Sequence, residues 1–385
     1  MKSILKIAAR LMIGALIGLI IVVPVIAIID GESMFTVAKT IFVSNGLKLV
    51  YMLVAAVLAS LTAFIVQLIV HEGGHLVAGL LTGYKFVSFR FLNFTLIRKD
   101  GRMQWRKYDL AGTGGQCLLT PPDKPIDEID TRWYNAGGVL ANLLLSLLGI
   151  ILLITVDMPG WLNIFWGVTA FIGIFFAITN GIPMKLGGVA NDGHNLFQME
   201  KDPTGKRYFL NILKSNALNQ EGVQPKDMPA DLFEQPEQPC DWKDQLFVGN
   251  VLLSASRMMN LHQWEEAYEL LREAYTHKKD IMPLYLNELN AMMVVSCIAT
   301  GRDDEARSHY TPKTQEYVSQ HSPTQSDKRL VAMAVALVLD NDRTAAEEMY
   351  NELQATKERF IHQGDVAMSL DLMRWMLDSR LEIRG

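Results

Sequence analysis

Cysteine is scarce in this chain of 385 residues, which contains only Cys117, Cys240 and Cys297. None of the three belongs to a C-x-x-C pair, so neither a disulfide framework nor a cysteine zinc cluster is indicated. Three isolated thiols suit a reducing cytosol.

An excess of basic residues is also missing. The 36 lysines and arginines are outnumbered by 41 acidic residues, for a net charge of −5, which gives no reason to expect a nucleic-acid partner.

Charge is absent from long stretches of the first half of the chain, and half of all residues are hydrophobic. Four runs contain no charged residue: 11–29, 49–70, 133–156 and 158–184. Each can supply the roughly 20 helical residues that cross a bilayer, so we predict four transmembrane helices. The first run resembles a signal peptide, but its apolar core is long and no A-x-A site precedes Asp30. A retained anchor is therefore expected.

The distribution of basic residues predicts how these helices are oriented. The loop after the second run is rich in them: Lys85, Arg90, Arg98, Lys99, Arg102, Arg106 and Lys107. The turn between the third and fourth runs has only Asp157. Basic loops stay on the cytoplasmic side. We therefore predict an integral protein of a bacterial cytoplasmic membrane, in contact with the lipid bilayer and with both termini in the cytoplasm.

A β-hairpin is predicted between the second and third runs. The segment F-V-S-F-R-F-L-N-F-T-L-I alternates bulky with smaller or polar residues, and R-K-D-G-R makes a turn before M-Q-W-R-K-Y. At the membrane surface, such a hairpin could offer its edge to an extended peptide by strand addition. A purely structural hairpin is the equal alternative.

The chain becomes polar and mostly helical from about residue 203, with a proline-rich segment around Q-P-K-D-M-P and E-Q-P-E-Q-P. Ala267, Ala306 and Ala346 recur at intervals of 39 and 40 residues in similar local sequences. This pattern is similar to tetratricopeptide repeats, although their period is nearer 34, and an irregular helical bundle is the alternative.

The fold class expected is a mainly α, polytopic membrane protein with a small hairpin. Its parts are a membrane core at 1–205, a linker at 206–245 and a helical interaction domain at 246–385, which would bind a cytoplasmic protein partner.

The second run contains the motif H-E-G-G-H. His71 and His75 are four residues apart, so a helix presents them on one face, where two nitrogens can bind one metal ion. Glu72 lies beside them. Ionisable residues inside a membrane segment are costly and usually functional. A straight helix from residue 49 to 84 would also exceed the bilayer thickness. Gly73 and Gly74 would allow a bend or the close approach of another backbone.

Three motifs in order resemble the site-2 protease family of intramembrane zinc metallopeptidases. They are H-E-G-G-H, then G-G-V-L-A-N ending at Asn142, then N-G-I-P…N-D-G containing Asp192, and they span about residues 47 to 205. The resemblance implies that His71, His75 and Asp192 bind zinc and that Glu72 is the general base. It also implies that Asn142 hydrogen-bonds the unwound substrate or the oxyanion. A structural amide between helices is the alternative for Asn142.

The chain departs from the family pattern at several positions. Val139 replaces a usual proline, the interval from Pro183 to Asp192 is about four residues longer, and His194 replaces a glycine. His194 is therefore an alternative metal ligand. The function expected is zinc-dependent hydrolysis of a membrane-spanning or membrane-tethered protein substrate. The alternatives are a non-catalytic membrane adaptor acting through its helical repeats, and a metal transporter, which the gathering of the polar residues near one side disfavours.

Overall fold

The computed structural model describes residues 33, 36, 46–99, 102–108, 114–186, 189–234 and 241–382. The first predicted transmembrane helix, at 11–29, lies outside these residues. The chain divides into two compact units. One comprises Met1–Gly74 and Ala136–Ile182, and the other His75–Asn135 and Pro183–Gly385. The chain passes between the two units at 74/75 and at 135/136, and each of these points lies within a continuous helix.

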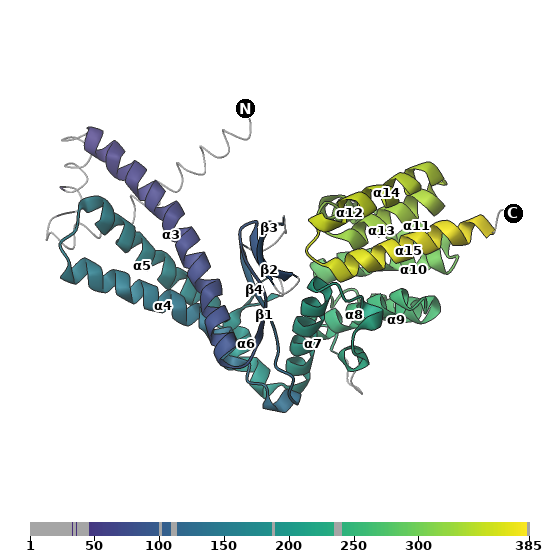
Figure 1. The fold of residues 1–385 in the computed structure, drawn as a ribbon, viewed down its shortest axis with the longest axis horizontal. Helices are drawn as coiled ribbons and strands as arrows, with labels where there is room; N and C mark the ends of the chain where they lie inside the picture. The colour runs from purple at the N-terminus through teal and green to yellow at the C-terminus, as the bar shows by residue number, and fades with distance from the viewer. Residues whose placement is uncertain are drawn as a thin grey trace. The chain divides into compact units, whose positions relative to one another are not determined.

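Three long apolar helices make up the described part of the first unit (Figure 1): α3 (Gly46–Leu81), α4 (Arg132–Thr155) and α5 (Gly160–Gly181). All three are long and apolar enough to cross a membrane. Large apolar side chains face outward along them, such as Leu58 at 59% and Leu144 at 67% exposure, as expected for a surface in contact with lipid. Three of the four predicted helices therefore have the length and composition of membrane spans.

Helix α3 passes through the H-E-G-G-H motif without a break. The close approach that its glycines permit occurs at Gly74, where an added β-carbon would lie 2.1 Å from the carbonyl oxygen of Gly137 in α4. Gly73 faces open space. The glycines of two separate motifs thus bring α3 and α4 together next to the histidines.

The predicted hairpin is part of a larger antiparallel sheet in the second unit. Its strands are β1 (Lys85–Phe91), β2 (Phe94–Lys99), β3 (Arg102–Lys107) and β4 (Gly115–Thr120), in the order β3-β2-β1-β4. The predicted β2–β3 pairing is present. However, residues 86–97 are not one strand, because Leu92 adopts a positive φ of 52° and folds β1 back on β2. The hairpin prediction was therefore too small, and it missed β4.

A short segment after α5 leads into the helical part of the second unit. It contains a two-stranded hairpin, β5 (Lys185–Leu186) with β6 (Val189–Ala190), followed by α6 (Asp192–Gln198) and α7 (Pro203–Gln220). Residues 206–220, expected in a linker, belong to α7. This helix begins with Asp202 as its N-cap and Pro203 in the first turn. Ala217 of α7 packs on the sheet residues Val87 and Leu118.

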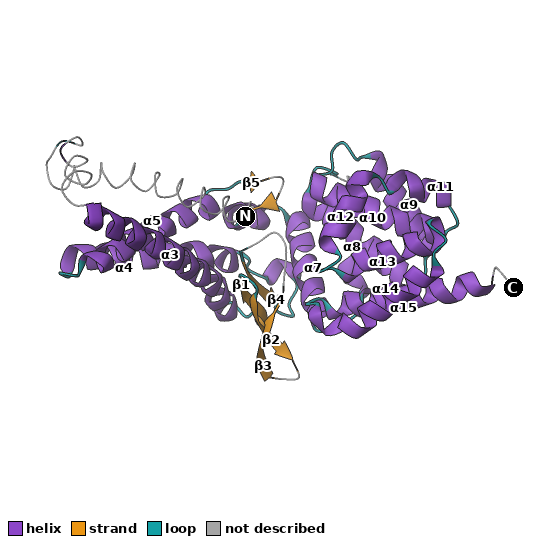
Figure 2. Ribbon diagram, turned by 90° about the horizontal axis from the view of Figure 1, so that it is seen from above, coloured by secondary structure: helices purple, strands orange, loops and turns teal. Residues whose placement is uncertain are grey.

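The rest of the second unit is helical (Figure 2). Its α-helices are α8 (Gln245–Asn260), α9 (Trp264–Thr276), α10 (Pro283–Ala299), α11 (Asp303–His309), α12 (Pro312–His321), α13 (Ser326–Ala334), α14 (Arg343–Thr356) and α15 (Gln363–Glu382). A π-helical turn, Val335–Leu339, extends α13. Short 3-10 turns lie at Ile126–Glu128, Met199–Lys201, Pro225–Asp227, Ala230–Phe233 and Lys357–Arg359.

The same local geometry recurs three times in this helical part. His262, Gly301 and Asn341 have positive φ angles of 58°, 76° and 56° in the turns before α9, α11 and α14. Five residues after each of them lies one of the spaced alanines, Ala267, Ala306 or Ala346, and all three are fully buried. A left-handed residue ends each preceding helix, and a small side chain then allows the next helix to pack closely.

Candidate metal centre

Helix α3 carries three polar side chains in an apolar environment. His71, Glu72 and His75 are each 7 to 8% exposed. The helix continues through all of them because its sequence has no proline. The spacing of four residues places His71 and His75 one above the other on the same face.

Asn142 in α4 determines which nitrogen of the His71 ring carries the hydrogen that the amide oxygen accepts. The Nδ2 group of Asn142 donates to the backbone oxygen of Gln67 at 2.9 Å, and a carbonyl can only accept, so the amide orientation is fixed. Its Oδ1 atom then faces His71 Nδ1 at 2.6 Å and must accept the proton of that nitrogen. His71 therefore directs the lone pair of Nε2 toward a possible metal ion.

His75 is held in the same tautomer by a different partner. Its Nδ1 atom donates to the backbone oxygen of Tyr134 at 2.6 Å. Tyr134 is fixed in turn, because its hydroxyl donates to the backbone oxygen of Cys117 in β4 and its ring stacks on Tyr84. The Nε2 atom of His75 lies 3.3 Å from Oδ2 of Asp192.

Asp192 is the first residue of α6, and Asn191 positions it. The side-chain oxygen of Asn191 accepts from the backbone N–H of His194 at 2.9 Å, as an N-cap, and also from the N–H of Met184 at 3.0 Å. The β5–β6 hairpin lies between these two anchors. The longer interval between Pro183 and Asp192 is thus closed by the hairpin, and Asp192 remains at the helix start.

One ligand atom each from His71, His75 and Asp192 lie within 4.8 Å of one another. His71 and His75 lie on one helix, so α3 fixes their separation. The contact with His75 fixes the position of the Asp192 carboxylate. In the described part of the chain, this group contains Asp192 and not His194. Two imidazoles and a carboxylate form a donor set that fits zinc, and each imidazole is oriented by a hydrogen bond on its other nitrogen.

Asn142 and Gln67 form one buried network between the three long helices. Both are completely buried. The Oε1 atom of Gln67 accepts from Asn142 Nδ2 at 2.6 Å, while its Nε2 group donates to the backbone oxygen of Thr169 in α5. The family resemblance implied that Asn142 hydrogen-bonds the unwound substrate or the oxyanion, with a structural amide between helices as the alternative. In the structure, both of its polar groups contact other residues of the protein.

Three residues that contribute to this site were not identified from the sequence: Gln67, Asn191 and Tyr134. Gln67 had a usable signal, since it is a lone amide in an apolar run, four residues before His71. Asn191 stands before a helix start, as an N-cap does. Tyr134 contributes a backbone oxygen, which its side chain could not have revealed.

The fold and the site together define a mainly helical chain with three helices of membrane-spanning length and a His-His-Asp group able to hold a metal ion. Comparison with protein-family models, with curated proteins and with solved structures gives no match.

Proposed function

We propose that this protein is a zinc-dependent endopeptidase that cleaves membrane-spanning or membrane-tethered protein substrates. The observation that carries the proposal is the convergence of the His71, His75 and Asp192 ligand atoms within 4.8 Å, beside a buried glutamate on a membrane-length helix. The ordered motifs that resemble site-2 proteases add support. A metal transporter would instead need polar groups along a crossing path.

Zinc would be held by His71, His75 and Asp192, and it would supply a Lewis acid that lowers the pKa of a coordinated water toward 7. Glu72 would accept the proton of the attacking water and return it to the leaving amine. Asn142 would keep His71 in its Nδ1–H tautomer, and the backbone oxygen of Tyr134 would do the same for His75. We therefore assign Asn142 a positioning role in place of direct substrate binding.

The remaining parts of the chain would select substrates and partners. An edge strand of the four-stranded sheet, whose order is β3-β2-β1-β4, would pair with an unwound substrate segment by strand addition. The threefold recurrence of buried alanines after left-handed turns favours a tetratricopeptide-like array that binds a cytoplasmic partner protein. The protein would reside in the cytoplasmic membrane of a bacterium, with its termini in the cytoplasm.

The proposal is tested by separating metal binding from turnover. Purified protein should contain about one zinc per chain, measured by mass spectrometry of the metal. His71→Ala, His75→Ala and Asp192→Asn should each lose it. Glu72→Gln should keep the zinc but lower cleavage of a model transmembrane peptide by at least about 10²-fold. Glu128→Gln, the same change at an exposed position, is the matched control.

The alternative of a non-catalytic adaptor predicts a different result. An adaptor could retain zinc, yet wild type and Glu72→Gln would then be equally inactive on every peptide and equally able to bind partners. Zinc retention in all three ligand variants would exclude the assigned metal site itself.

A further inference from the structure

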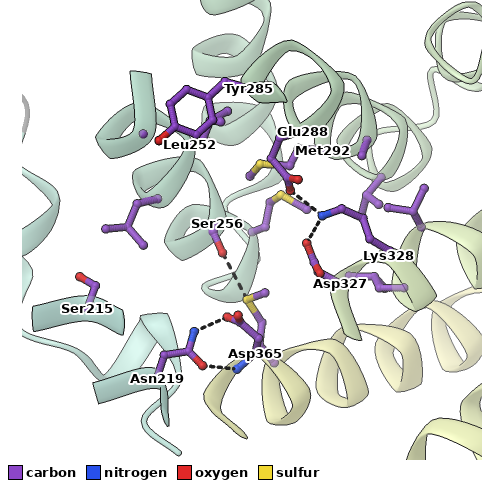
Figure 3. A pocket seen from close by; sticks show the side chains of 18 of the residues that line it. Ser215, Asn219, Leu252, Ser256, Tyr285, Glu288, Met292, Asp327, Lys328 and Asp365 are labelled. Atoms are coloured by element: carbon purple, nitrogen blue, oxygen red, sulfur yellow. Dashed lines mark hydrogen bonds and ion pairs between the residues drawn. The ribbon is translucent and has the colours of Figure 1, made fainter. Parts of the chain in front are cut away.

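Two lysines are buried in the described part of the chain, Lys206 at 5% and Lys328 at 1% exposure. Lysine is almost never buried unless its ammonium group is paired. Lys328 donates to Glu288 at 2.7 Å and to Asp327, so its partners lie in the same helical part of the chain (Figure 3). Lys206 of α7 instead donates at 2.8 Å to Oε2 of Glu200, which lies in the turn between α6 and α7. The Lys206 ammonium therefore fixes one oxygen of this carboxylate.

The second oxygen of the Glu200 carboxylate holds the start of α4. Its Oε1 atom accepts from the backbone N–H of Thr131 at 3.0 Å and from the Thr131 hydroxyl at 2.8 Å. Thr131 is fully buried and directly precedes Arg132, the first residue of α4. Burial favours the neutral form of Glu200, but the hydrogen bonds from Lys206 and Thr131 outweigh it and lower the pKa of this carboxyl below its ordinary value. The charged carboxylate thus lies at the positive end of the α4 dipole, where an anion is stabilised.

The start of α4 also orients His75. Tyr134, three residues after Thr131, supplies the backbone oxygen that accepts from His75 Nδ1 at 2.6 Å. The first turn of α4 is held together because the backbone N–H and the Nδ2 group of Asn135 both donate to the backbone oxygen of Thr131, at 3.1 and 2.8 Å. The place at which Glu200 holds Thr131 therefore sets the place of the oxygen that orients His75.

Glu200 also belongs to the helical segment that carries Asp192. Helix α6 begins at Asp192, and the 3-10 turn Met199–Lys201 follows it directly. Asp192 and Glu200 are eight residues apart on this segment, which is about 12 Å by helical rise. Asn191 fixes the first end of the segment by accepting from two backbone N–H groups. Glu200 fixes its last end.

These contacts join His75 to Asp192 by a second route, besides the direct distance of 3.3 Å between Nε2 and Oδ2. The route runs from His75 through the first turn of α4 to Glu200 and then along α6 to Asp192. All of it lies within the second unit. Metal ligands must keep their positions to within about 0.5 Å, and the residues that orient them affect metal affinity. Glu200 supplies the contact that closes this route.

We propose that Glu200 is a positioning residue of the candidate metal centre. It clamps the α6 segment that carries Asp192 to the start of α4 that orients His75, and Lys206 holds the clamp in place. The inference rests on the proposed function, because it takes His75 and Asp192 as metal ligands. It also adds Lys206 of α7 to the centre, beyond the core at 1–205 that the sequence predicts. A contact that serves only the packing of α7 is the alternative.

The clamp is first tested in the metal-free protein, by hydrogen–deuterium exchange of the full chain in detergent micelles. Glu200→Ala removes both acceptors, so amide exchange should become at least about tenfold faster at 131–135 and at 192–198. Thr131→Val deletes only the hydroxyl donor and keeps the shape of the side chain, so it should have a smaller effect in the same two segments. Unchanged exchange at 192–198 in Glu200→Ala would overturn the inference.

Metal binding then separates positioning from packing. Competition with a chelator measures the affinity for Zn²⁺. The visible absorption spectrum of the protein loaded with Co²⁺, which binds the same nitrogen and oxygen sites, reports the geometry of the ligands. Glu200→Ala should bind Zn²⁺ about tenfold more weakly and should change the cobalt spectrum.

Asn211→Ala is the matched control for packing. Asn211 is buried in the same helix, α7, and its Nδ2 group donates to the backbone oxygen of Leu232, which lies outside α4 and α6. The variant loses a buried hydrogen bond of α7 but keeps the clamp. Its Zn²⁺ affinity and its cobalt spectrum should therefore equal those of the wild type.

The double variant Glu200→Gln with Lys206→Met provides the rescue. It retains an acceptor for Thr131 and removes both charges of the buried pair together, which is often neutral for stability. It should recover most of the Zn²⁺ affinity that Glu200→Ala loses. Wild-type affinity in Glu200→Ala, or an equal loss in Asn211→Ala, would exclude the positioning role. If the wild type binds neither Zn²⁺ nor Co²⁺, the proposed function fails, and the exchange at 192–198 alone decides whether the clamp exists.

Discussion

At the scale of single residues, Asn142 offers a direct test of positioning against substrate binding. Its oxygen accepts from His71 and its amide donates to Gln67. Asn142→Ala removes the acceptor that fixes the His71 tautomer, so zinc affinity should fall about 10- to 100-fold. Asn142→Asp, which keeps an acceptor, should recover part of that loss. Competition with a zinc chelator measures both variants.

A substrate-binding role for Asn142 makes the opposite prediction. Zinc affinity would then be unchanged in Asn142→Ala, and the loss would appear in kcat or KM alone. Ser146→Ala is a suitable control, because Ser146 is buried in the same helix and its hydroxyl donates only locally, to the backbone oxygen of Asn142.

The buried carboxyl group of Asp365 should make the stability of the folded protein depend on pH. Burial, and secondarily the Asp327 carboxylate, raises the pKa of Asp365 from 3.8 to about 7. The folded protein therefore holds this proton more tightly than the unfolded chain. The stability that the proton confers is complete below about pH 4, falls as the pH rises, and is lost above about pH 7.

The comparison with Asp365→Asn isolates this contribution, since the amide stays neutral throughout. The difference between the two midpoints of thermal unfolding, variant minus wild type, should increase by a few degrees from pH 4 to pH 8. Midpoints measured by circular dichroism across that range test the expectation. A constant difference between the two proteins would contradict it.

At the scale of elements, two adjacent glycines of α3 should respond differently to the same change. A methyl group on Gly74 would collide with the backbone of Gly137. Gly74→Ala must therefore push α4 away, at a cost of about 1 to 3 kcal/mol, and weaken the contact between His71 and Asn142. Gly73→Ala meets no atom within 4 Å and should be neutral or slightly stabilising. Thermal unfolding and zinc content of both variants provide the measurement, and equal behaviour would contradict the close packing of α3 on α4.

The elements also show which features could be predicted from the sequence. Helices α3, α4 and α5 were predicted near their observed positions, because a long charge-free stretch is a strong signal. The sheet was predicted only in part, because its first turn depends on a positive φ at Leu92, and leucine is not a typical turn residue. His71, His75 and Asp192 were proposed from motif spacing. The hydrogen-bond partners of Asn142 were not predicted, because they depend on the rotation of α4 about its axis. Counting residues along the sequence does not provide that rotation.

At the scale of the whole molecule, the contact between α7 and the sheet predicts membrane sidedness. Ala217 of α7 packs on Val87 and Leu118, so the sheet and the helices from α7 onward must lie on the same side of a membrane. This agrees with an even number of crossings, α4 and α5, between them. The basic residues of the sheet predict that this side is the cytoplasm, and that the turn at Asp157 lies on the opposite side.

Single cysteines at three exposed positions test this arrangement: Met103 in β3, Asp157 after α4 and Leu284 in α10. The background carries Cys240→Ser, while Cys117 and Cys297 are buried and should react slowly. In intact cells, a membrane-impermeant maleimide should label Met103→Cys and Leu284→Cys only after permeabilisation, and Asp157→Cys without it. If positions 103 and 284 are labelled from opposite sides, the packing of α7 on β4 is wrong. If both are labelled from outside, the packing stands but the proposed orientation is reversed, and the peptidase centre would then be reached from the outer face.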